Sequence, residues 1–224
     1  MARAYNEIYL EDAMRNLGIA FEYACGSYHL SMDDFYTLFV NTGIADNFGS
    51  GNPKYIAGMS GIELARAVIN PNNEEENVDA YSNYDYSREY WCGWILAYYQ
   101  WFYGIDFRSL HYYLQMEDLN RLYGILHETS ELKAVEVISE NIKNKNLKTR
   151  LQYIRQKHNI SQSELANRSG VSLRMIQQYE QKQKDINQAS VAKLYSLSRV
   201  LHCQIEELLE WNFEFDQSEK KEKI

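Results

Sequence analysis

The stretch 160-ISQSELANRSGVSLRMIQQYEQ-181 predicts two short helices that are joined by a tight turn. Ser161 and Glu164 have the spacing of a capping box, so the first helix is expected to begin directly after Ser161. Gly170 lies where that helix would end, and glycine readily adopts the positive φ that such a turn requires. Ser172 is a favourable N-cap for the second helix. The stretch therefore predicts a helix-turn-helix.

The second of these helices is predicted to have one apolar face and one polar face. Met175, Ile176 and Tyr179 recur at helical spacing and are expected to point inward. The outward candidates for contacts with bases are Leu173, Arg174, Gln177 and Gln178. Arg can donate two hydrogen bonds to guanine, Gln can bond adenine, and Leu can contact the methyl group of thymine. This face therefore predicts contacts with base edges in the major groove of DNA.

Apolar periodicity extends the motif into a five-helix domain over residues 141–210. One helix is expected before the stretch, over about 146–157, and another is expected after it, where leucines recur at helical spacing. A short fifth helix is predicted over 205–209. The tail, residues 211–224, begins with alternating apolar and polar residues, and packing on the rest of the protein is favoured over strand pairing.

Charge is distributed unevenly along the 224 residues, which carry a formal net charge of −8. Residues 1–140 hold 8 Lys/Arg and 21 Asp/Glu, a net charge of −13. Residues 141–203 hold 12 and 3, a net charge of +9, and residues 204–224 hold 3 and 7, a net charge of −4. Local charge, rather than net charge, meets the phosphates of DNA. The basic segment can therefore bind DNA although the whole chain is acidic.

Eight residues of the segment 146–209 recur at the spacings of a known family: Arg155, Gln162, Leu165, Ala166, Gly170, Val171, Ile176 and Glu180. The segment resembles the lambda-repressor-like (XRE-type) helix-turn-helix family of bacterial and phage regulators. The resemblance implies that double-stranded DNA is the ligand, that Gln162 bonds a phosphate, and that the third helix contacts bases. The expected phosphate contacts are Ser161, Gln162, Ser172, Lys182, Lys184 and Asn187. Ser169 departs from the family, because an apolar residue is common before the turn glycine.

Residues 1–140 are predicted to form an acidic, aromatic-rich helical domain, so that the whole protein is all-α. Only two prolines occur in the chain, and patterns with a 3.6-residue period dominate it. The expected helices cover 5–24, a segment after Ser31, 60–70, 88–104, 107–114, 116–127 and 130–142, with loops at 41–61 and 71–87. The sequence 58-GMSG-61 could hold a phosphate, but no Walker lysine or preceding strand accompanies it. A plain helix cap is therefore favoured there.

The helix expected over 88–104 carries an aromatic stripe formed by Trp91, Trp94, Tyr98 and Trp101. Such a stripe is most often the core face of a central helix. The alternative is a groove that binds a partner protein or a planar ligand, because aromatic side chains are enriched where surfaces are recognised.

No catalytic, metal-binding or cofactor-binding residue is predicted. The sequence 127-HETSE-131 begins like the HExxH motif of zinc proteases but has Glu131 where the second His must stand. The three cysteines have no CxxC spacing, which argues against a zinc site and favours reduced thiols. No apolar run is long enough for a membrane helix, and the N-terminus does not resemble a signal peptide. We therefore expect a cytoplasmic protein that is not an enzyme.

A second resemblance spans most of the chain and is carried by the segments YLEDAM, GMSGIELA, WILAYYQW and LYGILHE. They are similar to antitoxin-type regulators that are encoded beside ADP-ribosyltransferase-like toxins. The resemblance implies a cognate toxin as the partner of the N-terminal domain, and repression of the protein's own operon. Two alternatives stay open, a repressor that senses a small ligand and an enzyme tethered to DNA. A homodimer is expected, because such proteins usually bind two half-sites.

Overall fold

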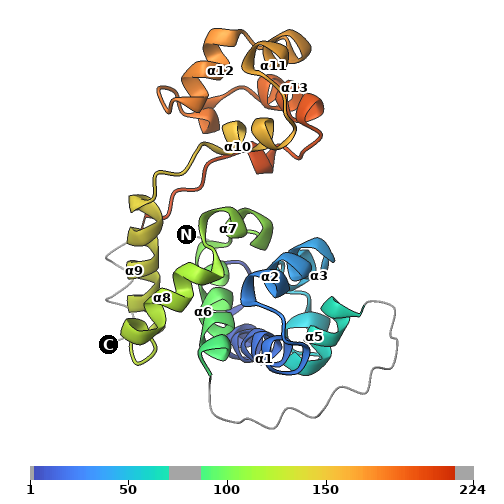
Figure 1. Ribbon diagram of the computed structural model, residues 1–224, viewed down its shortest axis with the longest axis vertical. Helices are drawn as coiled ribbons and strands as arrows, with labels where there is room; N and C mark the ends of the chain where they lie inside the picture. Colours follow the sequence, from blue (N-terminus) through green and yellow to red (C-terminus); the bar gives the residue numbers. More distant parts are fainter. Residues whose placement is uncertain (1–2, 71–86, 215–224) are drawn as a thin grey trace. The chain divides into compact units, whose positions relative to one another are not determined.

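The computed structural model describes residues 3–70 and 87–214, which belong to two compact units (Figure 1). The described residues of Met1–Asn144, together with Glu214, form the first unit, and Lys145–Phe213 form the second. Every regular element within the described residues is helical. The all-α prediction is therefore confirmed. The loop predicted at 71–87 lies outside the described residues, except for its last position.

Three helices form the centre of the first unit: α1 (Leu10–Tyr28), α5 (Gly61–Ile69) and α6 (Arg88–Tyr103). α1 packs against both of the others (Figure 1). Its contact with α6 is close because Gly93 has no side chain: a Cβ there would lie 2.6 Å from the Leu17 carbonyl oxygen. The elements around these three helices are η1 (Glu7–Tyr9), α2 (Met32–Asn41), α3 (Ile44–Gly49), α4 (Pro53–Ile56), α7 (Phe107–Tyr113), α8 (Met116–Leu126) and α9 (Glu131–Asn144).

Serine caps begin α2 and α5, as the sequence predicts. The Ser31 hydroxyl accepts a hydrogen bond from the Asp34 amide at 3.1 Å. Ser60 and Glu63 form a complete capping box, with bonds of 3.2 Å to the Ser60 hydroxyl and 2.7 Å to the Glu63 carboxylate. The Glu63 carboxylate accepts hydrogen bonds from the Ser60 amide and the Ser60 hydroxyl, and these two bonds lower the pKa of the Glu63 carboxyl. Ser60 therefore acts as the helix cap that the GMSG sequence was expected to supply.

Two expectations for the first unit are wrong in their boundaries. The first α-helix begins at Leu10 and continues to Tyr28, because a separate 3-10 turn occupies Glu7–Tyr9. The predicted loop at 41–61 contains α3 and α4. α4 begins where the Asn52 side chain accepts a bond from the Lys54 amide at 3.1 Å.

The aromatic stripe of α6 divides into a buried part and a half-exposed part. Tyr98 and Trp101 are each only 4% exposed, and Trp101 Nε1 donates a hydrogen bond to the Tyr5 carbonyl at 2.8 Å. These two residues belong to the core, the interpretation that the sequence favoured for the stripe, and their side chains are not accessible to a partner in this structure. Trp91 and Trp94 are half-buried.

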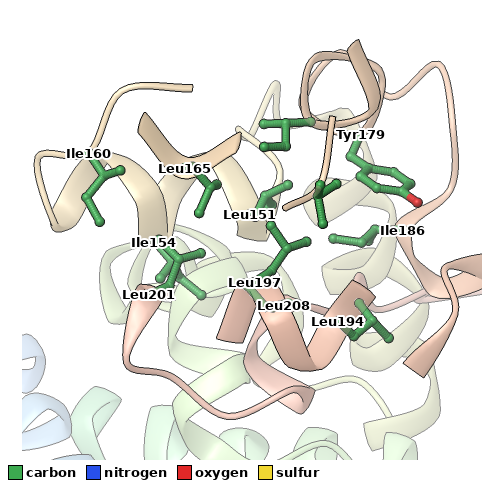
Figure 2. Packing of buried hydrophobic residues seen from close by; sticks show 12 residues of the cluster. Leu151, Ile154, Ile160, Leu165, Tyr179, Ile186, Leu194, Leu197, Leu201 and Leu208 are labelled. Atoms are coloured by element: carbon green, nitrogen blue, oxygen red, sulfur yellow. The ribbon is translucent and has the colours of Figure 1, made fainter. Parts of the chain in front are cut away.

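The second unit contains α10 (Arg150–Lys157), α11 (Gln162–Ser169), α12 (Leu173–Glu180) and α13 (Val191–Leu201), with the 3-10 turns η2 (Ile186–Gln188) and η3 (Glu206–Leu208). α10 begins at Arg150 and not near 146, because the Thr149 hydroxyl caps it by accepting the Gln152 amide at 3.2 Å. The predicted fifth helix is the single turn η3. Figure 2 shows the apolar residues from every one of these elements meeting in one core.

Candidate nucleic-acid interface

The start of α11 is fixed by one half of the predicted capping box. The Ser161 hydroxyl accepts a hydrogen bond from the Glu164 amide at 3.1 Å. The Glu164 carboxylate does not return the bond and instead lies 3.3 Å from Arg168 Nη1, one turn further along α11. The capping box is therefore incomplete, because the carboxylate has a basic partner on its own helix.

The turn between α11 and α12 depends on Gly170, whose φ is +71°. Its amide donates to the Ala166 carbonyl at 3.0 Å, which ends α11. The Ser169 hydroxyl donates to the Leu165 carbonyl at 2.6 Å and accepts from the Val171 amide at 3.2 Å. Both functions of this hydroxyl are satisfied, so a polar residue is accommodated where the family commonly has an apolar one.

The inward face of α12 joins the core of the second unit. Ile176 is completely buried and Tyr179 is 4% exposed, while Met175 is half-buried at the edge of the cluster. Tyr179 lies near Ile186 in this core, and Leu165 brings α11 into it (Figure 2). The inward assignment made from the sequence is therefore confirmed.

A buried ion pair connects α12 to the two helices before it. Arg155 Nε and Glu180 Oε1 are 2.6 Å apart, and Arg155 Nη2 lies 2.8 Å from the other carboxylate oxygen. Arg155 also donates to the Ile160 carbonyl at 2.7 Å, and Gln162 Nε2 donates to Glu180 Oε2 at 2.8 Å. The bond to Glu180 raises the pKa of the Arg155 guanidinium. α10, α11 and α12 are thus held together by charge-assisted bonds.

The polar face of α12 is free to meet a ligand. Leu173 is 37% exposed, Arg174 is exposed, and Gln177 and Gln178 are half-buried. Within residues 3–70 and 87–214, no group bonds the polar side-chain atoms of Arg174, Gln177 or Gln178. Their donors and acceptors are therefore available to base edges.

The expected phosphate contacts differ in how far the protein itself uses them. Ser161 and Ser172 cap α11 and α12. The side-chain amide of Gln162 donates a hydrogen bond to the Glu180 carboxylate. Lys182 Nζ donates to the Leu147 carbonyl at 3.0 Å, and Lys184 Nζ lies 3.7 Å from the sulfur of Met175.

Asn187 holds the C-terminal end of the second unit. Its Nδ2 donates to the Glu210 carbonyl at 2.7 Å, and its Oδ1 accepts from the Glu210 amide at 2.9 Å. The Glu210 carboxylate in turn accepts from the Arg150 amide at 2.6 Å. Both ends of the Asn187 side chain thus serve this internal contact, which the sequence did not indicate.

A second candidate site lies in the first unit. A hollow of about 350 Å³ is lined by Tyr90, Trp91, Trp94, Tyr123, His127 and Glu131. It includes the two aromatic residues of α6 that the core leaves half-exposed. That Trp91 and Trp94 belong to a recognition surface on α6 therefore remains a prediction.

Other kinds of site find little support in the described part of the chain. There, no cluster of His, Cys, Asp and Glu side chains is suited to hold a metal ion. Burial raises the pKa of Cys25 and of Cys203 to about 12 each, so these thiols are poor nucleophiles at neutral pH. No helix in the described residues has the length and apolar character that a membrane crossing requires.

A family model described as helix-turn-helix matches residues 151–208. No curated protein and no solved structure matches the chain. The match runs from the second residue of α10 to the end of η3, so it contains the turn between α11 and α12, the Arg155–Glu180 pair and the polar face of α12. Residues 151–208 therefore form a helix-turn-helix DNA-binding domain, of the type that transcription regulators carry, at the C-terminal side of a helical N-terminal part.

Proposed function

We propose that the protein binds one DNA sequence through the exposed face of α12 and regulates transcription there. The observation that carries the proposal is the combination of a free polar face with a fixed helix. Arg174, Gln177 and Gln178 have no internal partners among the described residues, and the Arg155–Glu180 pair holds the helix that presents them. A rigid helix with free donors and acceptors can distinguish base pairs in the major groove.

Selection from a random DNA library with the full-length protein tests this function. We expect one motif to be enriched, with a specific affinity at least about 1000-fold above that for random DNA at physiological salt. Protection of that motif from nuclease digestion should then be restricted to the selected bases. A pool that remains random after repeated rounds would contradict sequence-specific binding.

We also propose that the protein binds DNA as a homodimer. Val191 and Tyr195 lie one turn apart on α13 and are 73% and 57% exposed, so they offer an apolar surface to a second copy. The selected motif should then contain two half-sites whose centres are about 10 base pairs apart. Ultracentrifugation of the complex should find two chains per motif, and one chain per motif would contradict the dimer.

The finer proposal is that the protein is an antitoxin whose N-terminal domain binds a toxin, of the ADP-ribosyltransferase-like kind, and that it represses its own operon. The resemblance of the N-terminal segments to such regulators supports it. So does the net charge of −13 on residues 1–140, because opposite fields speed association with a basic partner.

Co-purification tests the antitoxin proposal directly. The tagged full-length protein should be expressed together with the neighbouring gene and purified in low salt. A second protein at one-to-one stoichiometry, whose toxicity the first protein abolishes, is the expected result. A single purified chain, with no protection from toxicity, would contradict the proposal.

The hollow between α6, α8 and α9 favours a second candidate, a repressor that senses a small molecule. A ligand that binds only the folded protein raises the temperature of unfolding. This candidate predicts ligand-dependent melting without a protein partner, whereas the antitoxin predicts stabilisation only by the toxin.

A further inference from the structure

The aromatic residues beside the hollow form a connected group. The ring centroids of Trp91 and Tyr123 are 5.6 Å apart in an edge-on arrangement, and Tyr123 stacks on His127 at 4.5 Å. Tyr90 and Trp94 are 5.8 Å apart and tilted by 30°. These contacts fix the side chains that line the hollow, so its shape exists before any ligand arrives.

α6 leaves these tryptophans accessible although it buries nearly everything else. Twelve of its sixteen residues are buried, and apart from Arg88 and Glu89 at its start the exceptions are Trp91 and Trp94. A half-exposed tryptophan that a core does not need leaves its π surface available to a ligand. The electron-rich face of an aromatic ring attracts a cation that lies within about 6 Å of its centroid.

Among the described residues of the lining, the one carboxylate is that of Glu131, the first residue of α9. Among the residues that the structure describes, no basic side chain pairs with it. A neutral apolar ligand in the hollow would remove water from this carboxylate without replacing its interactions, which is costly. An anionic ligand would be repelled by it. A cation would compensate the carboxylate and contact the aromatic faces at the same time.

One cation already lies against this aromatic group from outside. The Arg88 guanidinium is 5.5 Å from the centroid of Tyr123 and donates to Asn120 Oδ1 at 3.3 Å. Arg88 does not line the hollow. It shows that the ring of Tyr123 accommodates a guanidinium, and its positive charge opposes a second cation nearby.

We propose that the hollow is a binding site for an organic cation, an alkylammonium or guanidinium group, held between Trp91, Trp94 and Glu131. A volume of about 350 Å³ is at the lower end of the range for ligand sites and fits one small cation or the end of one basic side chain. The group belongs either to a free small molecule or to a Lys or Arg of a bound protein. The proposal rests on the hollow alone and does not depend on DNA binding.

Tryptophan fluorescence of the full-length protein, titrated with choline at constant ionic strength, tests the charge requirement. 3,3-Dimethylbutan-1-ol is the matched probe, because it has the shape of choline without its charge. Choline should bind at least about tenfold more tightly than the alcohol. Equal binding of the two probes, or no choline binding up to about 100 mM, would overturn the proposal.

Three variants assign the effect to the hollow. Glu131→Gln should weaken choline binding about tenfold, whereas Glu140→Gln removes the same charge from an exposed position of α9 and should leave it unchanged. Arg88→Gln should strengthen binding, because it removes the opposing charge. Equal effects of the two glutamate variants would overturn the assignment. Circular dichroism of each variant checks that the helices are retained.

A second titration distinguishes the two sources of the cation. Capped peptides with a single Arg or Lys are compared with free choline and methylguanidinium. Binding of a peptide at least about tenfold more tightly than of the free ions indicates a basic side chain of a protein partner. Equal affinity indicates a small molecule. Because no DNA is present, failure of either titration leaves the proposed DNA function untouched, and failure of DNA selection leaves this site untouched.

Discussion

Arg174 and Gln177 are the residues through which sequence-specific binding can be tested most directly. Both have free polar groups on the outer face of α12. Replacing either by Ala should reduce affinity for the preferred DNA site by about 1–3 kcal/mol and leave affinity for random DNA almost unchanged. Gel-shift titrations with both DNAs measure the difference. Arg121→Ala, which removes a 70% exposed arginine from the first unit, is the control. Equal losses on both DNAs would remove the two residues from the base-contact role.

The Arg155–Glu180 pair gives a prediction about stability at the same scale. Glu180→Ala leaves a buried guanidinium without its carboxylate and should destabilise the second unit by about 3–5 kcal/mol. Replacing both residues together by Met and Leu should cost much less, because no unpaired charge remains. Hydrogen exchange of α12 amides measures both effects. A single replacement no more costly than the double one would contradict this account of the pair.

Side-chain orientation on α12 could be predicted from the sequence, but several side-chain partners could not. Helical periodicity alone assigns Ile176 and Tyr179 to the core, and both are buried. Gln162 and Asn187 were expected to meet phosphates, yet each bonds a residue far along the chain, 18 and 23 positions away. Such partners depend on how the helices pack, and no local pattern encodes that.

At the scale of elements, the turn between α11 and α12 has a matched comparison in the first unit. A Cβ at Gly170 or at Gly124 would meet no atom within 4 Å, so the two positions differ only in their backbone. Gly170 has a φ of +71°, and Gly170→Ala should destabilise the second unit by about 1–2 kcal/mol. Gly124 lies within α8, and Gly124→Ala should stabilise the first unit by about 0.5–1 kcal/mol. Hydrogen exchange in each unit measures these changes, and equal signs would contradict the backbone argument.

Helix boundaries show which local signals the sequence analysis weighed wrongly. Leu147 fits the apolar period of α10 but precedes the helix. The Thr149 hydroxyl accepts the Gln152 amide, and this cap fixes the start of α10 at Arg150. Asn52 followed by Pro53 has the same kind of start signal and begins α4 inside a segment expected to be a loop. In both places the capping residue, rather than apolar period or glycine content, determines where the helix lies.

At the scale of the whole molecule, the change from acidic to basic sequence near residue 140 lies close to the boundary between the two units. The first unit contains most of the acidic residues and the aromatic hollow, and the second contains the basic helix-turn-helix. Family resemblance and charge could predict the DNA-binding part, because its chemistry is local. The hollow could be anticipated only as an aromatic stripe on α6, since its other residues come from α8 and α9 and their meeting depends on tertiary packing.

This division predicts that salt dependence of DNA binding reports local charge and not the net charge of −8. The logarithm of affinity should fall as the logarithm of salt concentration rises, because phosphate contacts release counterions. Lys184→Gln should make this slope shallower by about 0.9, the value for one lost phosphate contact. Lys133→Gln removes the same charge from an exposed position of the first unit and should leave the slope unchanged. Fluorescence anisotropy at several salt concentrations measures the slope for each variant. If the two variants changed the slope equally, the field of the whole chain, rather than phosphate contacts made by the second unit, would govern binding.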